Sequence, residues 1–390
     1  MEGAEEHDIV IVGGGISGLA TALALHRKGI KSVVLERGDS LRNEGGAIGI
    51  LANGWRALDQ LGLSVSDHLR QTAVLIQRSG ETRCLKRGYL INTLANALPS
   101  KTIRFGCTVI SVEFDSAVTV LHLLGGKTII AKIVIGCDGI RSVIGKFVGL
   151  NPIKQFPHSA VRGLTNYPKG HNFKHEFIRW MKDDCSSYVG RIPIDDKSVY
   201  WFVSQKSSLL DTKTWKDHDQ EHIRENTLEF LVANRFPKEV LEMINMSEVD
   251  SISFTCNLKY RAPWDLFFGN FRKGTVTVAG DAWHVIGPFL GQGGSAGLED
   301  AIVLARRLSQ AILGCDDERN GETVMKRVGQ AMDGYIKERR RRLLGLSTQT
   351  YLTGIMIQGP QIFIKVLIVF AMIVLFRDEE GHSKYDCGRL

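Results

Sequence analysis

Residues 9–37 read IVIVGGGISGLATALALHRKGIKSVVLER and decide the fold class. Ile9 to Val12 form a continuous apolar, β-branched run, which is typical of a parallel strand buried on both faces. Gly13, Gly15 and Gly18 follow in G-x-G-x-x-G spacing. In this motif the first glycine allows a tight turn, the second admits a pyrophosphate, and the third lets helix approach strand. The stretch therefore predicts a phosphate-binding turn at a helix N-terminus, with N–H groups facing the phosphates.

The end of this helix and the strand after it indicate what nucleotide is bound. Lys28 and Gly29 place a cation and a C-terminal glycine cap at the end of the predicted helix. The next strand, 32–35, delivers Glu36, which comes 18 residues after the last motif glycine. An acid at this place accepts hydrogen bonds from a ribose 2'-OH and repels a 2'-phosphate. The pattern predicts the adenosine half of FAD or NAD and disfavours NADP at this site.

The composition is that of a globular protein with a basic surface. The 390 residues suffice for two domains or one large domain with a lid, and 44% are hydrophobic. The net charge of +7 suits FAD and a nicotinamide cofactor, and it also suits nucleic acid or an anionic membrane. Part of the excess lies in 337–342, a run that is most often a solvated helix face. Since no nucleic-acid-binding motif accompanies this run, we expect no nucleic-acid partner.

Cysteine use and the N-terminus predict a cytoplasmic location. The seven cysteines are scattered and odd in number, which favours a reducing compartment over a disulfide framework. Neither C-x-x-C nor C-x-x-x-x-C occurs, which argues against a flavin-linked disulfide reductase. The first residues, MEGAEEHD, lead directly into the first strand, so we expect no targeting peptide here unless one has been removed.

The region after Glu36 predicts loops and helices around a flat ligand. Gly45 to Ala47 would let the main chain lie close to such a ligand, and 72–85 predicts two strands around a Ser79-Gly80 turn. A helical run over 89–98 follows Arg87. Before any family comparison, Arg87 fits a phosphate ligand and a charged helix start equally well.

A second marker comes at the end of two further predicted strands, 102–111 and 128–135. It is Asp138-Gly139, which puts a carboxylate at the carboxyl edge of the sheet, where open α/β sheets bind ligands. Taken alone it is a weak signal, because Asp-Gly is also an ordinary turn.

The sequence pattern changes between Arg162 and Val249. Alternating stretches at 185–192 and 198–204 indicate antiparallel strands, and 217–233 indicates a helix. We expect a separate layer here, an antiparallel sheet with one face free for a substrate.

The third marker, 275–301, reads TVTVAGDAWHVIGPFLGQGGSAGLEDA. A buried strand over 276–279 ends at Asp281, and a glycine-rich loop then opens a helix. A carboxylate at a strand end, followed by a helix N-terminus, can hold a polyol and place N–H donors against an electron-accepting ring. His284 lies inside this marker, where a catalytic base and a buried structural histidine are both open interpretations. We found no metal-binding or serine hydrolase motif, and we predict no metal site.

The C-terminal part predicts helices. A basic helix over 335–346 is followed by a break at Gly359-Pro360 and by 361–376, which is apolar except for Lys365. Sixteen residues are fewer than the roughly 20 needed to span a bilayer. Our first expectation is a helix packed on the protein, and our second is a peripheral membrane contact.

With the three markers in this order, the chain resembles the FAD-dependent, single-component aromatic hydroxylases of the p-hydroxybenzoate hydroxylase type. Among these it is similar to the plant monooxygenases related to zeaxanthin epoxidase. GGGISG, CDGIRS, GDAWHVIGPFLGQGG and YDCG carry the resemblance, which covers nearly the whole chain. The cofactor-binding residues that it implies are Gly13, Gly15, Ile16, Ser17, Gly18, Glu36, Arg37, Ala47, Arg87, Val109, Asp138, Asp281, Pro288, Gly291, Gly293 and Gly294.

The resemblance also implies roles for some of these residues. Arg87 would lie near the pyrophosphate of FAD, and Asp138 belongs to a motif serving both FAD and NAD(P)H. Asp281 would bind the ribityl chain, and Gly293 and Gly294 would offer N–H groups to the pyrimidine edge of the flavin. Pro288 would sit near the ring.

The implied activity is that of a monooxygenase. NADPH or NADH would reduce the bound FAD, O2 would add as a C4a-hydroperoxide, and one oxygen atom would pass to a small aromatic or other electron-rich substrate. This scheme requires no dedicated acid or base, so the catalytic residues stay unknown. Arg162 and Trp201 are candidates for the substrate side. The alternatives are a flavin oxidase or dehydrogenase without oxygen transfer, and a non-catalytic flavoprotein scaffold.

The predicted fold class is α/β, a Rossmann-like FAD-binding domain with a parallel sheet, plus an antiparallel-sheet substrate domain and C-terminal helices. We assign 1–72, 84–158 and 254–345 to a discontinuous FAD-binding domain. We assign 73–83 and 159–253 to the substrate domain, and 346–390 to a C-terminal helical segment.

Overall fold

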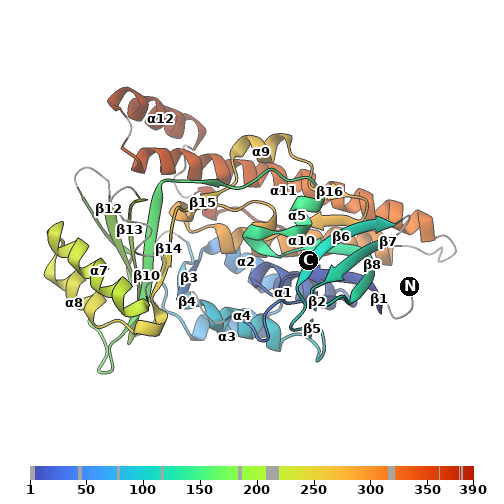
Figure 1. The fold of residues 1–390 in the computed structure, drawn as a ribbon, viewed down its shortest axis with the longest axis horizontal. Helices are drawn as coiled ribbons and strands as arrows, with labels where there is room; N and C mark the ends of the chain where they lie inside the picture. Colours follow the sequence, from blue (N-terminus) through green and yellow to red (C-terminus); the bar gives the residue numbers. More distant parts are fainter. Residues whose placement is uncertain are drawn as a thin grey trace.

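The computed structural model describes residues 5–42, 46–76, 80–115, 118–182, 187–207, 219–314, 321–359, 361–376, 378 and 381–390. A mixed sheet with its helices forms one side of the molecule and an antiparallel sheet forms the other (Figure 1). The C-terminus lies beside the mixed sheet, and the described chain begins at Glu5 in the first strand of that sheet. Some expectations from the sequence fall outside the described residues, namely those on Gly45, Ser79, Cys185, Asp217 and Pro360.

The mixed sheet is built around the predicted first strand. β1 (Glu5–Val12) pairs in parallel with β2 (Val33–Leu35) and with β8 (Thr128–Gly136). The strand order is β16-β17-β8-β1-β2-β5, parallel from β17 to β5, and β6 and β7 form a hairpin beside β8. The other strands of this sheet are β5 (Ile103–Arg104), β6 (Val109–Asp115), β7 (Val118–Leu123), β16 (Arg272–Lys273) and β17 (Val276–Val278). Val10 and Ile11 have no exposed surface, as expected of a strand covered on both faces.

Helices cover this sheet. α1 (Ile16–Arg27) packs against α10 (Gly293–Leu313), which brings the first and third markers together. The helix α1 ends as predicted, because Gly29 takes the left-handed conformation (φ 75°) just after the Lys28 cap. The smaller helices of this region are α2 (Ala52–Gln60), α3 (Leu63–Gln71), α4 (Arg87–Asn96) and α5 (Val143–Phe147).

Two expectations about this layer hold only in part. The strand predicted over 102–111 is divided into β5 and β6, because the chain turns at Gly106 (φ 65°) and its N–H donates to the Gly38 carbonyl. Of the hairpin predicted over 72–85, the described residues form an antiparallel bridge between Leu75 and Arg83, with the Ile76 N–H donating to the Thr82 carbonyl (2.8 Å), and they form no longer ladder with each other. Instead, β4 (Arg83–Lys86) pairs with β3 (Ala47–Ile50), a partner far from it in sequence that local patterns do not reveal.

The antiparallel sheet has the order β11-β12-β13-β10-β14. Its strands are β10 (His158–Asn166), β11 (Ile178–Met181), β12 (Ser187–Pro193), β13 (Ser198–Lys206) and β14 (Ser253–Thr255). One face of the sheet packs on α7 (Gln220–Ala233) and α8 (Lys238–Asn245), which lie on its outer side in Figure 1. Val161, Trp201 and Val203 belong to the core between them. The opposite face is turned toward the rest of the molecule. A two-stranded ladder of β9 (Lys154–Gln155) and β15 (Lys259–Tyr260) joins the two regions.

The C-terminal region differs most from expectation. The predicted helix over 335–346 is part of α11 (Gly321–Ile357), which runs without a break across residue 346. Two further helices pack on α11, namely α9 (Pro263–Phe268) and α12 (Ile362–Leu375). A helix packed on the protein was our first expectation for α12. Of its side chains only Ile368 is buried, so most of α12 is exposed.

Candidate active site

The three motif glycines have different surroundings. Gly13 has φ 110°, and a β-carbon there would lie 2.4 Å from the Cys137 carbonyl oxygen. A β-carbon at Gly18 would lie 2.0 Å from the Gly13 carbonyl oxygen, so this glycine lets α1 approach β1. At Gly15 a β-carbon would meet no atom within 4 Å. The free space beside Gly15, at the start of α1, fits a pyrophosphate.

Glu36 is held at the end of β2 by main-chain donors. Its carboxylate accepts hydrogen bonds from the N–H groups of Gly14 (2.7 Å) and Gly38 (2.9 Å), and the residue is 8% exposed. This geometry fixes the carboxylate beside the glycine loop, where a ribose would place its hydroxyls. Arg37 is exposed. Val109 begins β6 close to this end of the sheet, since the Cys107 N–H donates to the Glu36 carbonyl.

Residues of the third marker contact the first marker at Ser17. Gly280 (φ 61°) follows β17, and a β-carbon there would lie 2.8 Å from the Ser17 side chain. The Ser17 hydroxyl also donates to the Gly297 carbonyl of α10 (3.3 Å). Ile16, the first residue of α1, is partly buried against the same core. The turn that carries Asp281 is therefore fixed against the N-terminal turn of α1.

Asp281 has exposed surface, and protein nevertheless surrounds it closely enough for burial to raise the pKa of its carboxyl. His284 and Arg87 act in the opposite direction. The pKa of Arg87 is lowered by burial and by the charges of Arg162 and Arg42, while Asp281 opposes this. Asp281 thus keeps accessible surface although nearby protein disfavours its charge, and we call the region between its turn, Arg87 and the inner face of the antiparallel sheet the recess. Asp281, Arg87 and Arg162 come from three separate elements, and Arg87 is within electrostatic reach of both Asp281 and Arg162.

The helix α10 begins at this recess. Gly291 takes the left-handed conformation (φ 64°), and α10 then begins at Gly293. A β-carbon at Gly293 would meet nothing closer than 4.0 Å, so main-chain N–H groups are accessible there. Gly294 lies against Ile48 of β3, the strand that also carries Ala47. Pro288 is exposed in the turn that precedes the helix. A helix N-terminus with accessible N–H groups attracts an electron-rich ring edge.

His284 is a buried structural residue. Its ring Nε2 lies 2.7 Å from the Asp300 carboxylate, and neither side chain has exposed surface. Asp300 also accepts hydrogen bonds from the Gly280 N–H (2.9 Å) and from Arg339 Nε (2.7 Å). Burial opposes ionisation of Asp300, but His284 and Arg339 outweigh it and hold its pKa at about 2. The structure thus supports the second of the two interpretations of His284, a residue that supports the Asp281 turn.

The basic run at 337–342 does not lie wholly on a solvated helix face as expected. Arg339 is fully buried and forms ion pairs with Asp300 and with Glu299 (2.6 Å). Arg342 also reaches Glu299 (3.1 Å). The run was expected on a solvated face, yet these two arginines fasten α11 to the buried side of α10.

Asp138 has protein partners. Its carboxylate accepts hydrogen bonds from the Ser142 hydroxyl (2.5 Å) and from the Val143 N–H (2.6 Å). Burial raises the pKa of this carboxyl, and those hydrogen bonds oppose the rise. The geometry fits a residue that orders the start of α5 beside the Gly13 turn.

The two substrate candidates lie on opposite faces of the antiparallel sheet. Arg162 is on the inner face, where its guanidinium donates to Ser253 Oγ (3.1 Å) and Thr255 Oγ1 (3.2 Å). Trp201 has no exposed surface, and its indole N–H donates to Ser247 Oγ (2.8 Å) in the core under α7 and α8. The structure therefore brings Arg162 to the recess and does not bring Trp201 there.

Sequence reasoning missed Tyr200, which is the neighbour of Trp201 on the inner face. It pairs with Leu164 in the ladder, and a β-carbon at Gly46, beside β3, would lie 3.2 Å from its ring. Burial raises the pKa of Tyr200 to about 12, although the nearby Arg162 opposes this. Strand alternation was the available signal, but it does not say which of the two faces is covered by helices.

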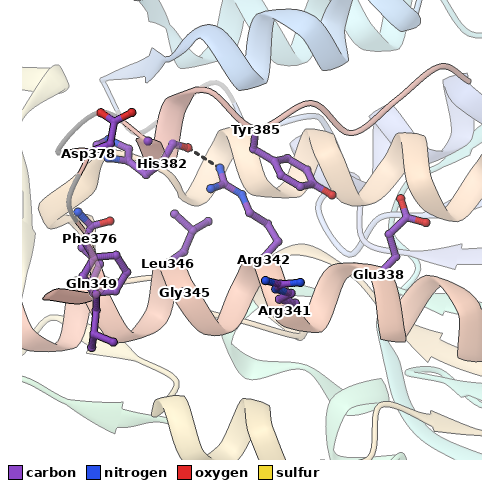
Figure 2. A pocket seen from close by; sticks show the side chains of 12 residues that line it. Glu338, Arg341, Arg342, Gly345, Leu346, Gln349, Phe376, Asp378, His382 and Tyr385 are labelled. Carbon is purple, nitrogen blue, oxygen red and sulfur yellow. Dashed lines mark hydrogen bonds between the residues drawn. The ribbon is translucent and has the colours of Figure 1, made fainter. Parts of the chain in front are cut away.

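A separate cavity of about 430 Å³ lies between α11 and the C-terminal segment (Figure 2). Arg342 crosses it and donates to the His382 carbonyl (2.5 Å), and Tyr385 lies beside this guanidinium. Arg341 lines the cavity with Leu375 and Phe376, from the end of α12. It contains none of the cofactor residues predicted from the sequence.

We searched the described residues for metal-binding clusters and for membrane-spanning helices. Within it, no group of three or more His, Cys, Asp or Glu side chains is arranged to hold a metal ion. Of the helices in the described ranges, none combines the length and the apolar character that a bilayer crossing requires.

Comparison with known proteins identifies the family. A sequence model described as FAD binding domain matches residues 92–324, and one described as FAD dependent oxidoreductase matches residues 8–98. Monooxygenase 1 of Arabidopsis thaliana is 45% identical over 99% of this chain and 100% of its own length. Monooxygenase 2 of the same plant is 36% identical, with full coverage of both chains. The chain belongs to the FAD-binding family of FAD-dependent monooxygenases.

Solved structures share the fold. HpxO of Klebsiella pneumoniae in complex with FAD and uric acid has a TM-score of 0.74 and 19% identity, covering 98% of this chain and 97% of its own. FqzB has a TM-score of 0.76 and 18% identity, covering 97% of this chain and 90% of its own. The Rossmann-like fold class and the FAD cofactor predicted from the sequence are thus confirmed.

Proposed function

We propose that the protein consumes NADPH or NADH and inserts one oxygen atom of O2 into a small aromatic or other electron-rich substrate. The reaction would take place in the recess between the third marker and the inner face of the antiparallel sheet. One observation carries the proposal: Arg87 of α4 is within electrostatic reach both of Asp281, in the third marker, and of Arg162, on the inner face of the antiparallel sheet.

The residues around the recess fit FAD. The free space at Gly15 and the start of α1 suit the pyrophosphate, and Glu36 suits the adenosine ribose. Asp281 would accept hydrogen bonds from the ribityl chain, and the N–H groups at Gly293 would face the flavin ring. FAD supplies the redox chemistry and the activation of O2, while these residues bind and orient it.

Two side chains would orient the substrate. Arg162 is held in place by Ser253 and Thr255 and would attract an anionic or carbonyl oxygen. The high pKa of Tyr200 keeps its hydroxyl protonated at physiological pH, so it can donate a hydrogen bond to a phenolic or carbonyl oxygen. Phe202 lies on the same face as these two residues, since it pairs with Arg162. This combination fits a flat aromatic molecule that carries oxygen.

Domain division and location are further parts of the proposal. The Val74 N–H donates to the Ile194 carbonyl (3.0 Å), which supports assigning 73–83 to the substrate domain with 159–253.

The described cysteines 84, 107, 137, 256 and 387 are free thiols, which supports the reducing environment of the cytoplasm. The nicotinamide cofactor would act transiently, because Glu36 suits the adenosine ribose of FAD itself.

A screen of phenolic and indolic compounds tests the proposal. The FAD-loaded protein is given NADPH or NADH under ¹⁸O2, and cofactor oxidation, H2O2 and product mass are followed. A true substrate should speed cofactor oxidation and gain one ¹⁸O atom. Conversion of all O2 to H2O2 without labelled product would indicate an oxidase. No flavin reduction by either cofactor, with any compound, would indicate a scaffold.

A further inference from the structure

The helix α12 exposes apolar side chains to solvent, whereas an ordinary surface helix exposes polar ones. Its sequence, IFIKVLIVFAMIVL, contains a single charged residue, Lys365. Lys365, Ile368 and Met372 are buried or half-buried and have the i, i+3 and i+4 spacing of one stripe facing the protein. The side chains turned to solvent are apolar, for example Phe363 (68% exposed) and Phe370 (66%). A helix that covers a core shows its apolar stripe to the protein instead.

The exposed apolar surface covers most of the circumference of α12. Exposed apolar residues occupy consecutive positions at 362–364 and again at 373–375. Three consecutive helical positions span about 200° around the axis. A neighbouring helix, such as that of a second copy, would cover a single stripe of each partner. An apolar medium that surrounds the helix from several sides suits this surface better.

The helix α9 adds aromatic side chains to the same surface. Trp264, Phe267 and Phe268 are 42%, 54% and 80% exposed. Both α9 and α12 pack on α11 and rise on the same side of it in Figure 1. Tryptophan and other aromatic residues concentrate where a bilayer meets water. Exposed apolar patches of this kind mark interaction sites.

Three cations lie beside this apolar surface, and the two carboxylates of the Figure 2 cavity, Glu338 and Asp378, are paired with Arg306 and Lys384. Lys154 is exposed, and its ammonium lies 4.5 Å from the centre of the Trp264 ring. Arg340 donates to the Gly269 carbonyl (2.9 Å) at the end of α9. Arg341 is exposed in the cavity of Figure 2, beside Leu375 and Phe376. These cations would meet the phosphates of a lipid headgroup layer, and the net charge of +7 favours an anionic surface.

We propose that α12 and α9 form a docking surface for an anionic phospholipid bilayer. The 14 residues of α12 extend about 21 Å, less than the roughly 30 Å of a hydrocarbon core. The helix therefore lies in the interface of one leaflet, with its apolar side chains among the acyl chains and the cations at headgroup level. None of the residues named for this surface is among those named at the recess, so the enzyme would be held at the membrane without its cofactor residues taking part.

Vesicle flotation of the FAD-loaded full chain tests the docking surface. Vesicles of phosphatidylcholine alone are compared with vesicles that also contain phosphatidylserine. We expect binding to both, stronger with phosphatidylserine and weakened by salt. The double variant Phe363→Glu, Phe370→Glu should lower the bound fraction at least about tenfold, because two charges would enter the acyl region. Lys154→Glu with Arg341→Glu should remove the preference for phosphatidylserine.

A matched control is the double variant Leu124→Glu, Val232→Glu, which changes two exposed apolar residues outside α9 and α12, one directly after β7 and one in α7. It should float like the wild type, and all variants should keep the flavin absorbance spectrum. Failure of the wild type to float with either vesicle would overturn the proposal, as would an equal loss in the control. A dimer in light scattering that only the α12 variant disperses, without vesicle binding, would assign this surface to a second copy.

Discussion

The cofactor layer and the antiparallel layer position their side chains by different means. In the cofactor layer, Gly13, Gly18 and Gly280 fix the main chain, and buried ions such as Asp300 and Arg339 fasten the helices around it. In the antiparallel layer, one face of the sheet packs on α7 and α8 through an apolar core. The side chains along each strand point alternately to the two faces, and this alternation decides which of them face the recess. The first kind of site can be read from motifs, whereas the second depends on which face is covered.

Trp201→Ala should give the largest effect and should act on stability alone. Removing a fully buried indole from the core of the antiparallel layer is expected to cost about 3 to 5 kcal/mol of unfolding free energy. Urea unfolding measures this loss, and FAD titration of the folded protein should give the wild-type affinity. If Trp201→Ala stays as stable as the wild type and loses substrate selectivity, the two faces of the sheet have been assigned the wrong way round.

Acid should weaken the cofactor layer first. The folded pKa of Asp300 is about 2, below its ordinary value of 3.8. A depressed carboxyl pKa contributes stability that is complete above pH 4 and is lost as the pH falls from about 4 to about 2, here about 2 kcal/mol. Urea unfolding at several pH values, monitored through the release of flavin, should show this fall of the unfolding free energy with pH. Asp300→Asn should flatten it, and the exposed Asp67→Asn should leave it unchanged. Equal slopes in all three proteins would contradict the role of this ion pair.

Asp281→Ala tests the cofactor side of the recess without touching the core. The residue is exposed, so the protein should fold and keep its melting temperature. Loss of a charge-assisted hydrogen bond to the ribityl chain should weaken FAD by about 2 kcal/mol, or about thirtyfold. Fluorescence titration of deflavinated protein measures the affinity. Full FAD affinity with lost turnover would mean that Asp281 acts on the reaction.

Tyr200→Phe should have the smallest effect, and it should concern the substrate. Loss of one hydrogen bond to the substrate is worth about 1 kcal/mol, or about a fivefold rise in KM for the best compound of the screen. FAD affinity and melting temperature should not change. Trp201→Phe is the neighbouring control, and it should lower stability and leave KM unchanged. The reverse pattern would place the substrate on the other face.

The sequence predicted the cofactor side well, for a physical reason. The phosphate turn and the Glu36 position depend on glycine conformation and on a local strand–helix–strand order, which are visible within residues 9–37. Asp281 was visible in the same way, at a strand end followed by a glycine loop.

What the sequence did not predict depends on distant partners. Arg339 was expected in solvent because its carboxylate partners, Glu299 and Asp300, lie about 40 residues earlier in the chain. Tyr200 was passed over for Trp201 because α7 and α8, which cover one face, are separate elements. The pairing of β4 with β3 was missed for the same reason. The exposure of α12 matches the second of the two expectations and not the first, because its composition suits a buried helix equally well.

The central claim is that FAD lies across the start of α1, and Gly15→Val tests it most directly. Gly15 has φ −81° and ψ −176°, an extended conformation that valine adopts readily, and no atom lies within 4 Å of its β-carbon position. The variant should fold with an unchanged melting temperature, while its side chain fills the space of the pyrophosphate. In FAD titration of deflavinated protein, the wild type should bind one FAD per chain and Gly15→Val should bind at least about a hundredfold more weakly, a loss of about 2.7 kcal/mol. Gly345→Ala, at another open glycine, should bind like the wild type. Wild-type FAD affinity in Gly15→Val would contradict the account.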